Sequence, residues 1–471
     1  MIADLKPYPE YKDSGLPWLG QVPEHWGLVP NRGLIRKRKV LVGNRNQEYR
    51  LLSLTKQGVK VRDISTGKGK FSSDMGTSQE VRCGDLVFCL FDVPETPRTV
   101  GLSQYAGMIT GAYTVFEPKG GVSSKYFELF YKAMDDRKLL SPLYSGLRHT
   151  IPCERFLGTK TPLPPPAEQA AIVRFLDWAN GRLDRAIRAK RKIIALLNEQ
   201  KQTIIQRAVT RGLDPDVKLK PSGIPWLGDI PEHWEVRRLG QVIRIQTGYP
   251  FPSNGFVQGE TGIRLLRGIN VTPTGIRWDE VVHWQRKLGD GLDDFELNVG
   301  DIILGMDRPI IGSGVRVATI QEKDIPSMLL QRVARLRPDK SIDTRFMLFL
   351  LRGRLFLDYM APIFTGISVP HLSPQQIKSF SLPLPSLNEQ KTIISHLDKE
   401  TNLLENTNSR LEREIELLRE YRTRLVADVV TGKLDVHEAA AKIRDEDILD
   451  SKMIEDETSD EVETLEEGEE A

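Results

Sequence analysis

The stretch Ser14-Gly-Leu-Pro-Trp-Leu-Gly-Gln-Val-Pro-Glu-His-Trp26 recurs later in the chain as Ser222-Gly-Ile-Pro-Trp-Leu-Gly-Asp-Ile-Pro-Glu-His-Trp234. Ten of the thirteen positions are identical, at an offset of 208 residues. Two copies of this length indicate an internal repeat, and a repeat governs how the rest of the chain is interpreted. We therefore treat the 471 residues as two related halves.

A second pair of motifs follows in the same order in each half. Pro162-Leu-Pro-Pro-Pro-Ala-Glu-Gln169 corresponds to Pro383-Leu-Pro-Ser-Leu-Asn-Glu-Gln390. Between the markers, Gly84-Asp-Leu-Val-Phe88 matches Gly300-Asp-Ile-Ile-Leu304, each predicting a turn followed by a short apolar strand. The remaining sequence diverges. Constant frames around variable interiors predict two modules with one architecture and two different ligands.

Each second motif opens a segment with no internal proline and a helical period, at residues 168–209 and 389–430. An apolar residue recurs at every seventh position, which predicts two long coiled-coil helices. The seam residues are Leu176, Leu183, Leu197 and Ile204 in the first helix, and Leu397, Leu404, Leu411, Leu418 and Leu425 in the second. Lys190 is a polar break in the first seam.

The charges of the two helical segments favour their pairing with each other. Residues 168–211 carry ten basic and four acidic side chains, whereas residues 389–433 carry eight and nine. Two equivalent halves would then be related by a pseudo-two-fold axis, with the helices antiparallel. A five-leucine heptad also permits a homodimer through residues 389–430, and that alternative stays open.

The net charge of +2 conceals a very uneven distribution. Residues 445–471 hold 14 acidic side chains and one Lys, a net charge of −13, so residues 1–444 carry +15. A basic body is suited to a polyanion such as nucleic acid. The acidic end has too few large apolar residues to form a core, so we expect it to be disordered.

The sequence lacks the residues that several classes of protein need for their function. Cys83, Cys89 and Cys153 make neither a disulfide framework nor a zinc quartet, and the seven His form no metal-binding motif. His25 and His233 are expected to pack beside Trp26 and Trp234. The sequence contains no phosphate-binding loop, complete dinucleotide fingerprint or Asn/Asp-Pro-Pro-Tyr/Phe motif of amino-methyltransferases. We predict a chain without catalytic activity.

The chain has no apolar stretch near the ~18 to 20 residues that span a bilayer, and its first ten residues lack the apolar core of a signal peptide. We therefore expect a cytoplasmic protein that is not bound to a membrane.

The duplicated Trp-containing frame, the Gly-Asp strand and the Pro-Leu-Pro-x-x-x-Glu-Gln helix start strongly resemble specificity subunits of type I restriction-modification systems. The resemblance covers about residues 8–435. It implies a subunit that binds double-stranded DNA for phage defence, each module reading one half of a bipartite target. Two methyltransferase subunits would supply S-adenosylmethionine and methylate adenine, and a motor and nuclease subunit would use ATP and Mg. No cofactor is expected on this chain itself.

The expected fold is α+β, with two similar α/β target-recognition domains separated by two long helices in an antiparallel coiled coil. The expected segments are 1–160 and 214–382 for the recognition domains, 161–213 and 383–435 for the helices, and 436–471 for the acidic tail. The competing class is a coiled-coil scaffold or homodimer with two protein-binding modules.

Loops that follow strands supply base readout, and Arg, Lys, Asn and Gln fit the groove edges of DNA. The candidates are Lys56, Gln57, Arg98 and Arg148 in the first module, and Arg267, Asn270, Arg308 and Arg316 in the second. Each could instead contact phosphate or lie on an ordinary surface, since most protein–DNA hydrogen bonds go to the backbone. No catalytic or metal-binding residue is expected.

Overall fold

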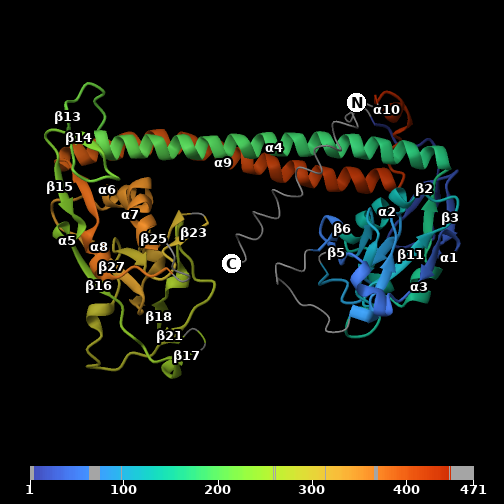
Figure 1. Cartoon of the computed structure of the whole chain (residues 1–471), viewed down its shortest axis with the longest axis horizontal. Coiled ribbons are helices and arrows are strands. Elements are labelled where there is room, and N and C mark those ends of the chain that lie inside the picture. Colours follow the sequence, from blue (N-terminus) through green and yellow to red (C-terminus); the bar gives the residue numbers. More distant parts are fainter. Residues whose placement is uncertain are drawn as a thin grey trace. The chain divides into compact units, whose positions relative to one another are not determined.

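The computed structural model describes residues 5–62, 75–96, 98–257, 259, 261–312, 314–364, 370–444 and 446. These residues form two compact units (Figure 1). The first unit comprises the described residues of 1–190 and 413–446, and the second those of 191–412. The unit boundaries fall inside two long helices, α4 (Pro166–Arg211) and α9 (Leu387–Val430), so each unit contains one end of each helix.

A four-stranded antiparallel sheet forms the centre of the first unit. Its strands are arranged in the order β4 (Ile35–Arg38), β11 (Thr114–Pro118), β8 (Leu86–Phe88) and β9 (Val100–Leu102). Helix α2 (Ser124–Asp136) begins where the Ser123 hydroxyl accepts a hydrogen bond from the Tyr126 amide. Its aromatic residues pack in one core cluster with Phe88 and Phe116. Core packing thereby holds α2 against the sheet.

Smaller strands complete the first unit. The hairpin of β5 (Leu52–Thr55) and β6 (Gly58–Val61) shares a second apolar cluster with β7 (Gln79–Val81) and β10 (Gly107–Ile109). Strand β3 (Gly27–Pro30) pairs with β12 (Lys160–Leu163), which immediately precedes α4. The β3–β12 pair therefore closes the module at its two chain ends.

The second unit repeats this sheet. Its order is β16 (Ile243–Thr247), β27 (Val333–Pro338), β22 (Ile302–Gly305) and β25 (Val317–Thr319), again antiparallel. Helices α6 (Thr344–Arg352) and α7 (Arg354–Phe364) contribute to the same core. Strand β15 (Glu235–Arg238) pairs with β28 (Ser381–Leu384), as β3 pairs with β12. The equivalent strand order supports the interpretation of the sequence as a duplication.

The second unit also contains a sheet built differently from the small strands of the first. It runs β17 (Phe256–Val257), β21 (His283–Trp284), β18 (Ile263–Leu266) and β26 (Ser327–Leu329), and its β18–β26 pairing is parallel. This part of the chain lies in the variable interior of the repeat. Here the two modules differ in structure as well as in sequence.

The predicted Gly-Asp turns have the same geometry in both units. Gly84 has a φ of +90° and Gly300 a φ of +91°, a backbone region that is open to glycine without a steric penalty. The Asp85 carboxylate accepts the amide of Arg82 at 2.7 Å, and that of Asp301 accepts the amide of Asn298 at 2.9 Å. The turn before each central strand is thus fixed by two adjacent residues.

The two long helices run antiparallel within each unit. In the first unit, Asp184 pairs with Arg422 at 2.6 Å and Lys190 pairs with Glu414. In the second, Asn198 bonds Asn408 at 2.8 Å and Lys201 pairs with Glu405 at 2.6 Å. Partner numbers in α9 fall as those in α4 rise. The polar break at Lys190 therefore has a partner of opposite charge.

All of the predicted seam residues are at least partly buried. Leu176, Leu183, Leu397, Leu404 and Leu425 are buried, and Leu197, Ile204, Leu411 and Leu418 are half-buried. The helices begin at residues 166 and 387, later than the expected 161 and 383, because the preceding residues are committed to β12 and β28. None of the described helices is both long and apolar enough to cross a membrane.

The boundary expected for the acidic tail at residue 436 is wrong. Residues His437–Ala441 form helix α10, and Val436, Ala439, Ala440 and Ile443 are buried in the core cluster of the first unit. These apolar side chains lie at helical spacing, so they share one face of the helix and can be buried together. The acidic run begins only after them. The predicted disorder of the acidic run falls on residue 445 and residues 447–471, which lie outside the described residues.

Candidate nucleic-acid interface

The duplicated motifs of the first unit meet at a buried carboxylate. Glu168, only 3% exposed, accepts hydrogen bonds from Trp26 Nε1 at 2.9 Å and from Tyr8 Oη at 2.5 Å. His25 Nε2 lies 2.8 Å from its other oxygen. Burial, aided by the hydrogen bond to Glu168, raises the pKa of Tyr8, so its hydroxyl remains a donor. The cluster joins the N-terminal frame to the start of α4.

The second unit repeats this junction in a more open form. Trp234 Nε1 donates to Glu389 Oε1 at 2.9 Å, and His233 Nε2 lies 3.2 Å from Oε2. The Glu389 side chain is 29% exposed. His25 and His233 thus lie beside their Trp neighbours, as predicted, and both contact the carboxylate at the start of the long helix.

The Gln of each second motif closes the module behind this junction. Gln169 accepts the Ser123 amide at 2.7 Å and donates to the carbonyls of Gly121 and Pro164. Gln390 accepts the Asp343 amide at 2.7 Å and donates to the carbonyls of Ser341 and Pro385. Both Gln side chains therefore tie the loop before a core helix to the start of a long helix.

The far end of the other long helix packs on the same Trp. Gly432, with φ of +76°, follows α9, and a Cβ there would lie 2.3 Å from Pro23 and 3.0 Å from Trp26. Gly212, with φ of +73°, follows α4, and a Cβ there would lie 3.3 Å from Trp234. Each Trp thus contacts the start of one long helix and the end of the other. The repeated motifs build the frame of each unit, and the variable interiors lie between them in the sequence.

In the first unit, the candidate DNA contacts divide into exposed and engaged side chains. Lys56 and Gln57 are exposed at the tip of the β5–β6 hairpin. Arg98 pairs with Asp136 at 2.5 Å and donates to the Lys56 carbonyl at 3.3 Å, so it holds the hairpin to the end of α2. Arg148 is exposed, and its carbonyl accepts the Asp92 amide at 3.0 Å.

Asn270 in the second unit is not available to DNA. It is only 2% exposed, its amide donates to the carbonyls of Arg277 and Glu280, and its oxygen accepts the Arg267 amide. Arg267 also donates to the Glu280 carbonyl at 2.9 Å. A polar side chain in a loop often forms hydrogen bonds to the backbone of that same loop. A sequence pattern does not distinguish such a residue from one that reads a DNA base. Asn270 is therefore not a candidate DNA contact.

Arg308 and Arg316 lie around Asp307. Arg316 donates to the Val271 carbonyl at 3.0 Å, and burial, with the positive charge of Arg308 adding to it, lowers the pKa of Arg316. Burial alone would raise the pKa of Asp307, but hydrogen bonds from His371 at 2.6 Å and Arg332 at 2.9 Å hold it below its usual value. Arg308 itself is exposed. This cluster carries a local excess of positive charge.

Sequence reasoning missed three members of these loop clusters: Asp92, Arg332 and His371. A signal was present for Asp92, because the offset of 216 between the Gly-Asp motifs aligns it with Arg308. Arg332 and His371 carry no such mark. Only folding brings them to Asp307.

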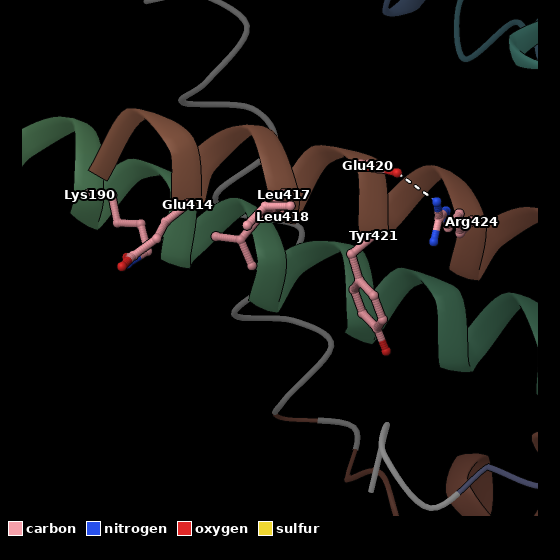
Figure 2. A pocket seen from close by; sticks show the side chains of 7 residues that line it. All are labelled: Lys190, Glu414, Leu417, Leu418, Glu420, Tyr421 and Arg424. Carbon is pink, nitrogen blue, oxygen red and sulfur yellow. Dashed lines mark hydrogen bonds and ion pairs between the residues drawn. The ribbon is translucent and has the colours of Figure 1, made fainter. Parts of the chain in front are cut away.

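A groove lies on the helix pair in the first unit. Figure 2 shows Leu418 and Tyr421 projecting from α9 over α4, with Lys190 and Glu414 at one end. The groove is open to solvent and has a volume of about 700 Å³, and the Leu417 and Tyr421 side chains that line it are 48% and 42% exposed. Exposed apolar side chains beside charged ones are typical of a surface that binds another protein.

The residues that the structure describes contain no group of three or more His, Cys, Asp or Glu side chains arranged to hold a metal ion.

Comparisons with known proteins agree on one family. A family model for the type I restriction modification DNA specificity domain matches residues 231–417. The MjaVIII specificity subunit of Methanocaldococcus jannaschii is 28% identical over 332 residues, 70% of this chain and 75% of that protein. The EcoAI specificity subunit of Escherichia coli is 34% identical over 172 residues, which is 36% of this chain and 29% of that protein.

A solved structure shares the fold. A chain from a type I R-M system, 14% identical, matches 87% of this chain and 98% of its own length with a TM-score of 0.61. The family model and the curated relatives carry the same family description, and the solved structure adds agreement of the fold. The chain is similar to specificity subunits of type I restriction enzymes in sequence and to a chain from a type I R-M system in fold.

Proposed function

We propose that this chain is a specificity subunit of a type I restriction-modification system and that it reads a bipartite DNA target, with each unit recognising one half. The observation that carries the proposal is the repeated junction of Trp26 with Glu168 and of Trp234 with Glu389. One frame is built twice, while the loops between its motifs differ in sequence and in strand arrangement. Two such modules fit two different half-sites on double-stranded DNA.

The two long helices would act as a ruler between the half-sites. Each unit has an antiparallel contact between the helices, Asp184 with Arg422 in the first unit and Asn198 with Asn408 in the second. A paired antiparallel coiled coil is stiffer than a flexible linker, so its length would set the gap between the two recognised sequences. The same contacts favour pairing within one chain over a homodimer through residues 389–430.

The chemistry would come from partner subunits. The sequence lacks the motif of amino-methyltransferases, so two methyltransferase subunits would supply S-adenosylmethionine and methylate adenine. A motor and nuclease subunit would use ATP and Mg for restriction. The groove with Leu417 and Tyr421 offers one surface on which a methyltransferase subunit could dock. Purified alone, the chain should transfer no methyl group.

An exchange of modules tests the proposal. Residues 31–159 lie between the paired strands β3 and β12, so replacing them with the same segment of another family member leaves the frame intact. Mapping methylated sites in cells should show one half of the target changed and the other half retained. If both halves change, or neither does, the division of labour is wrong.

A salt titration separates DNA recognition from the scaffold alternative, which the comparisons do not favour. Affinity for DNA that depends on neutralising Z phosphates falls with a log–log slope of about −0.9Z. A module that binds a protein partner shows no such dependence on duplex DNA. The measurement needs only the assembled complex and a labelled duplex.

A further inference from the structure

The two units contain an equivalent corner just after the central strand. Asp92 follows β8 with a φ of +46°, and Arg308 follows β22 with a φ of +43°. The Asp92 amide donates to the Arg148 carbonyl at 3.0 Å, and the Arg308 amide donates to the Pro370 carbonyl at 2.8 Å. Asp92 and Arg308 therefore occupy the same backbone position in their respective modules.

A second pair of hydrogen bonds confirms the equivalence. The Ile151 amide donates to Leu90 O at 2.7 Å, and the Leu372 amide donates to Met306 O at 2.8 Å. Leu90 and Met306 each stand two residues before the corner. In both modules the loop before a short helix, α3 (Cys153–Gly158) or α8 (Pro374–Ser379), is hydrogen-bonded to the end of the central strand.

The left-handed backbone at this corner disfavours a side chain. Positive φ is uncommon for residues with a Cβ, although Asp and Asn tolerate it better than most, and glycine adopts it freely. An Arg side chain does not stabilise this backbone conformation, yet Arg308 occupies it in the second module. Local backbone energy would favour glycine at both positions. The presence of two charged side chains instead points to a role for the side chains themselves.

The side chains of both corner residues are unpaired in the described part of the chain. Within the described part of the chain, neither the Asp92 carboxylate nor the Arg308 guanidinium makes a hydrogen bond or ion pair. Their neighbours are engaged: Asp307 bonds His371 and Arg332, and Arg316 bonds Val271 O. Asp92 is half-buried and Arg308 is exposed. Each corner therefore presents one unpaired charge held by a rigid backbone.

We propose that Asp92 and Arg308 are equivalent base-reading residues of the two modules. Arg308 would donate to O6 and N7 of a guanine, and Asp92 would accept a hydrogen bond from the exocyclic amino group of a cytosine, both in the major groove. The inference rests on the proposed recognition of a half-site by each unit. It assigns the two modules opposite chemistry at one shared position.

The opposite charges give different kinds of discrimination. Arg308 lies beside Arg316 and Arg332, so it meets DNA in a positive environment and its specificity comes from the two acceptors of guanine. A carboxylate brought close to phosphates is unfavourable unless it accepts a hydrogen bond. Asp92 would therefore act mainly by rejecting bases that lack an amino group at that edge.

The test uses the complex with its methyltransferase subunits, S-adenosylmethionine and a library of randomised DNA duplexes, with methylated products identified by sequencing. Asp92→Gly and Arg308→Gly remove the side chains while suiting the left-handed backbone, so the fold should be retained. Discrimination should fall about 10-fold or more at one base pair. That base pair should lie in the first module's half-site for Asp92→Gly and in the second module's half-site for Arg308→Gly.

Lys138→Gly is the matched control. Lys138 has a φ of +50° just after α2, and its side chain pairs with Asp135, so the change relieves similar strain away from the corner. It should leave the base preferences unaltered. Unchanged preferences in the corner variants would overturn the inference, as would a weakening shared equally by all sequences, which indicates a phosphate contact. If the unmodified complex methylates no split site, the proposed function fails instead.

Discussion

The indole Nε1 of Trp234 donates a 2.9 Å hydrogen bond to Oε1 of Glu389, 155 residues further along the chain. The same bond joins Trp26 to Glu168 in the first unit. The two junctions differ in exposure, because Glu168 is 3% exposed and the Glu389 side chain is 29% exposed. The same motif thus lies in a buried environment in the first unit and in a more solvent-exposed one in the second. This difference should appear as a difference in stability.

Glu168→Ala should destabilise the first unit more than Glu389→Ala destabilises the second. Removing Glu168 leaves Trp26 Nε1 and Tyr8 Oη buried without their acceptor. The free energy of unfolding should therefore fall by about 3 kcal/mol. Water can replace the more open Glu389, so about 1 kcal/mol is expected there. Urea unfolding followed by tryptophan fluorescence measures both. Glu24→Ala, an exposed change, serves as the control, and equal losses at the two junctions would contradict the assignment.

Reversing the charge of Lys190 should weaken the helix pair in the first unit. Lys190→Glu places a carboxylate beside Glu414 in a partly buried seam. The repulsion should lower the free energy of unfolding by about 1 kcal/mol. Glu414→Lys in the same chain should restore most of that loss. The double-mutant cycle is read by thermal unfolding. Additive effects of the two changes would show that the residues do not interact.

The three cysteines should react with iodoacetamide in a fixed order. Burial raises the pKa of the Cys89 and Cys153 thiols, so at pH 8 a smaller share of each is the reactive thiolate. Cys83 is exposed, Cys153 is half-buried and Cys89 is buried, so labelling should proceed in that sequence. Mass spectrometry of timed samples checks the order. Unfolding in urea should equalise the rates, and early labelling of Cys89 in the folded protein would contradict its burial.

Lengthening both helices by one heptad should lengthen the gap in the DNA target. The Asn198–Asn408 contact identifies matched positions, between Asn198 and Glu199 and between Thr407 and Asn408. Seven residues preserve the seam and add about 10.5 Å, or roughly 3 bp of DNA at about 3.4 Å per step. Methylome sequencing should find the same half-sites further apart.

Extension of only one helix is the control for that experiment. The extra turns of that helix have no partner helix, so the chain should assemble poorly with the proposed methyltransferase subunits. A doubly extended chain that assembles normally and still methylates only the original spacing would refute the ruler.

Much of the frame was predictable from the sequence because its signals are local or repeated. The heptad leucines anticipated the long helices, and Gly84 and Gly300 anticipated the turns before the central strands. Asn270 shows where this reasoning ends. Its residue type suits DNA, but the hydrogen bonds to Arg277 and Glu280 that occupy it depend on how one loop folds on itself.

By itself the sequence determined the duplication, the heptad period and the charge contrast between the body and the acidic end, since each is a property of residue order alone. Only the tertiary structure decided that Trp26 meets Glu168, 142 residues away, and that Asp92 and Arg308 share one left-handed corner. The availability of a side chain depends on burial and on partners that distant segments bring to it. Those contacts form between surfaces, and no spacing along the chain encodes them directly.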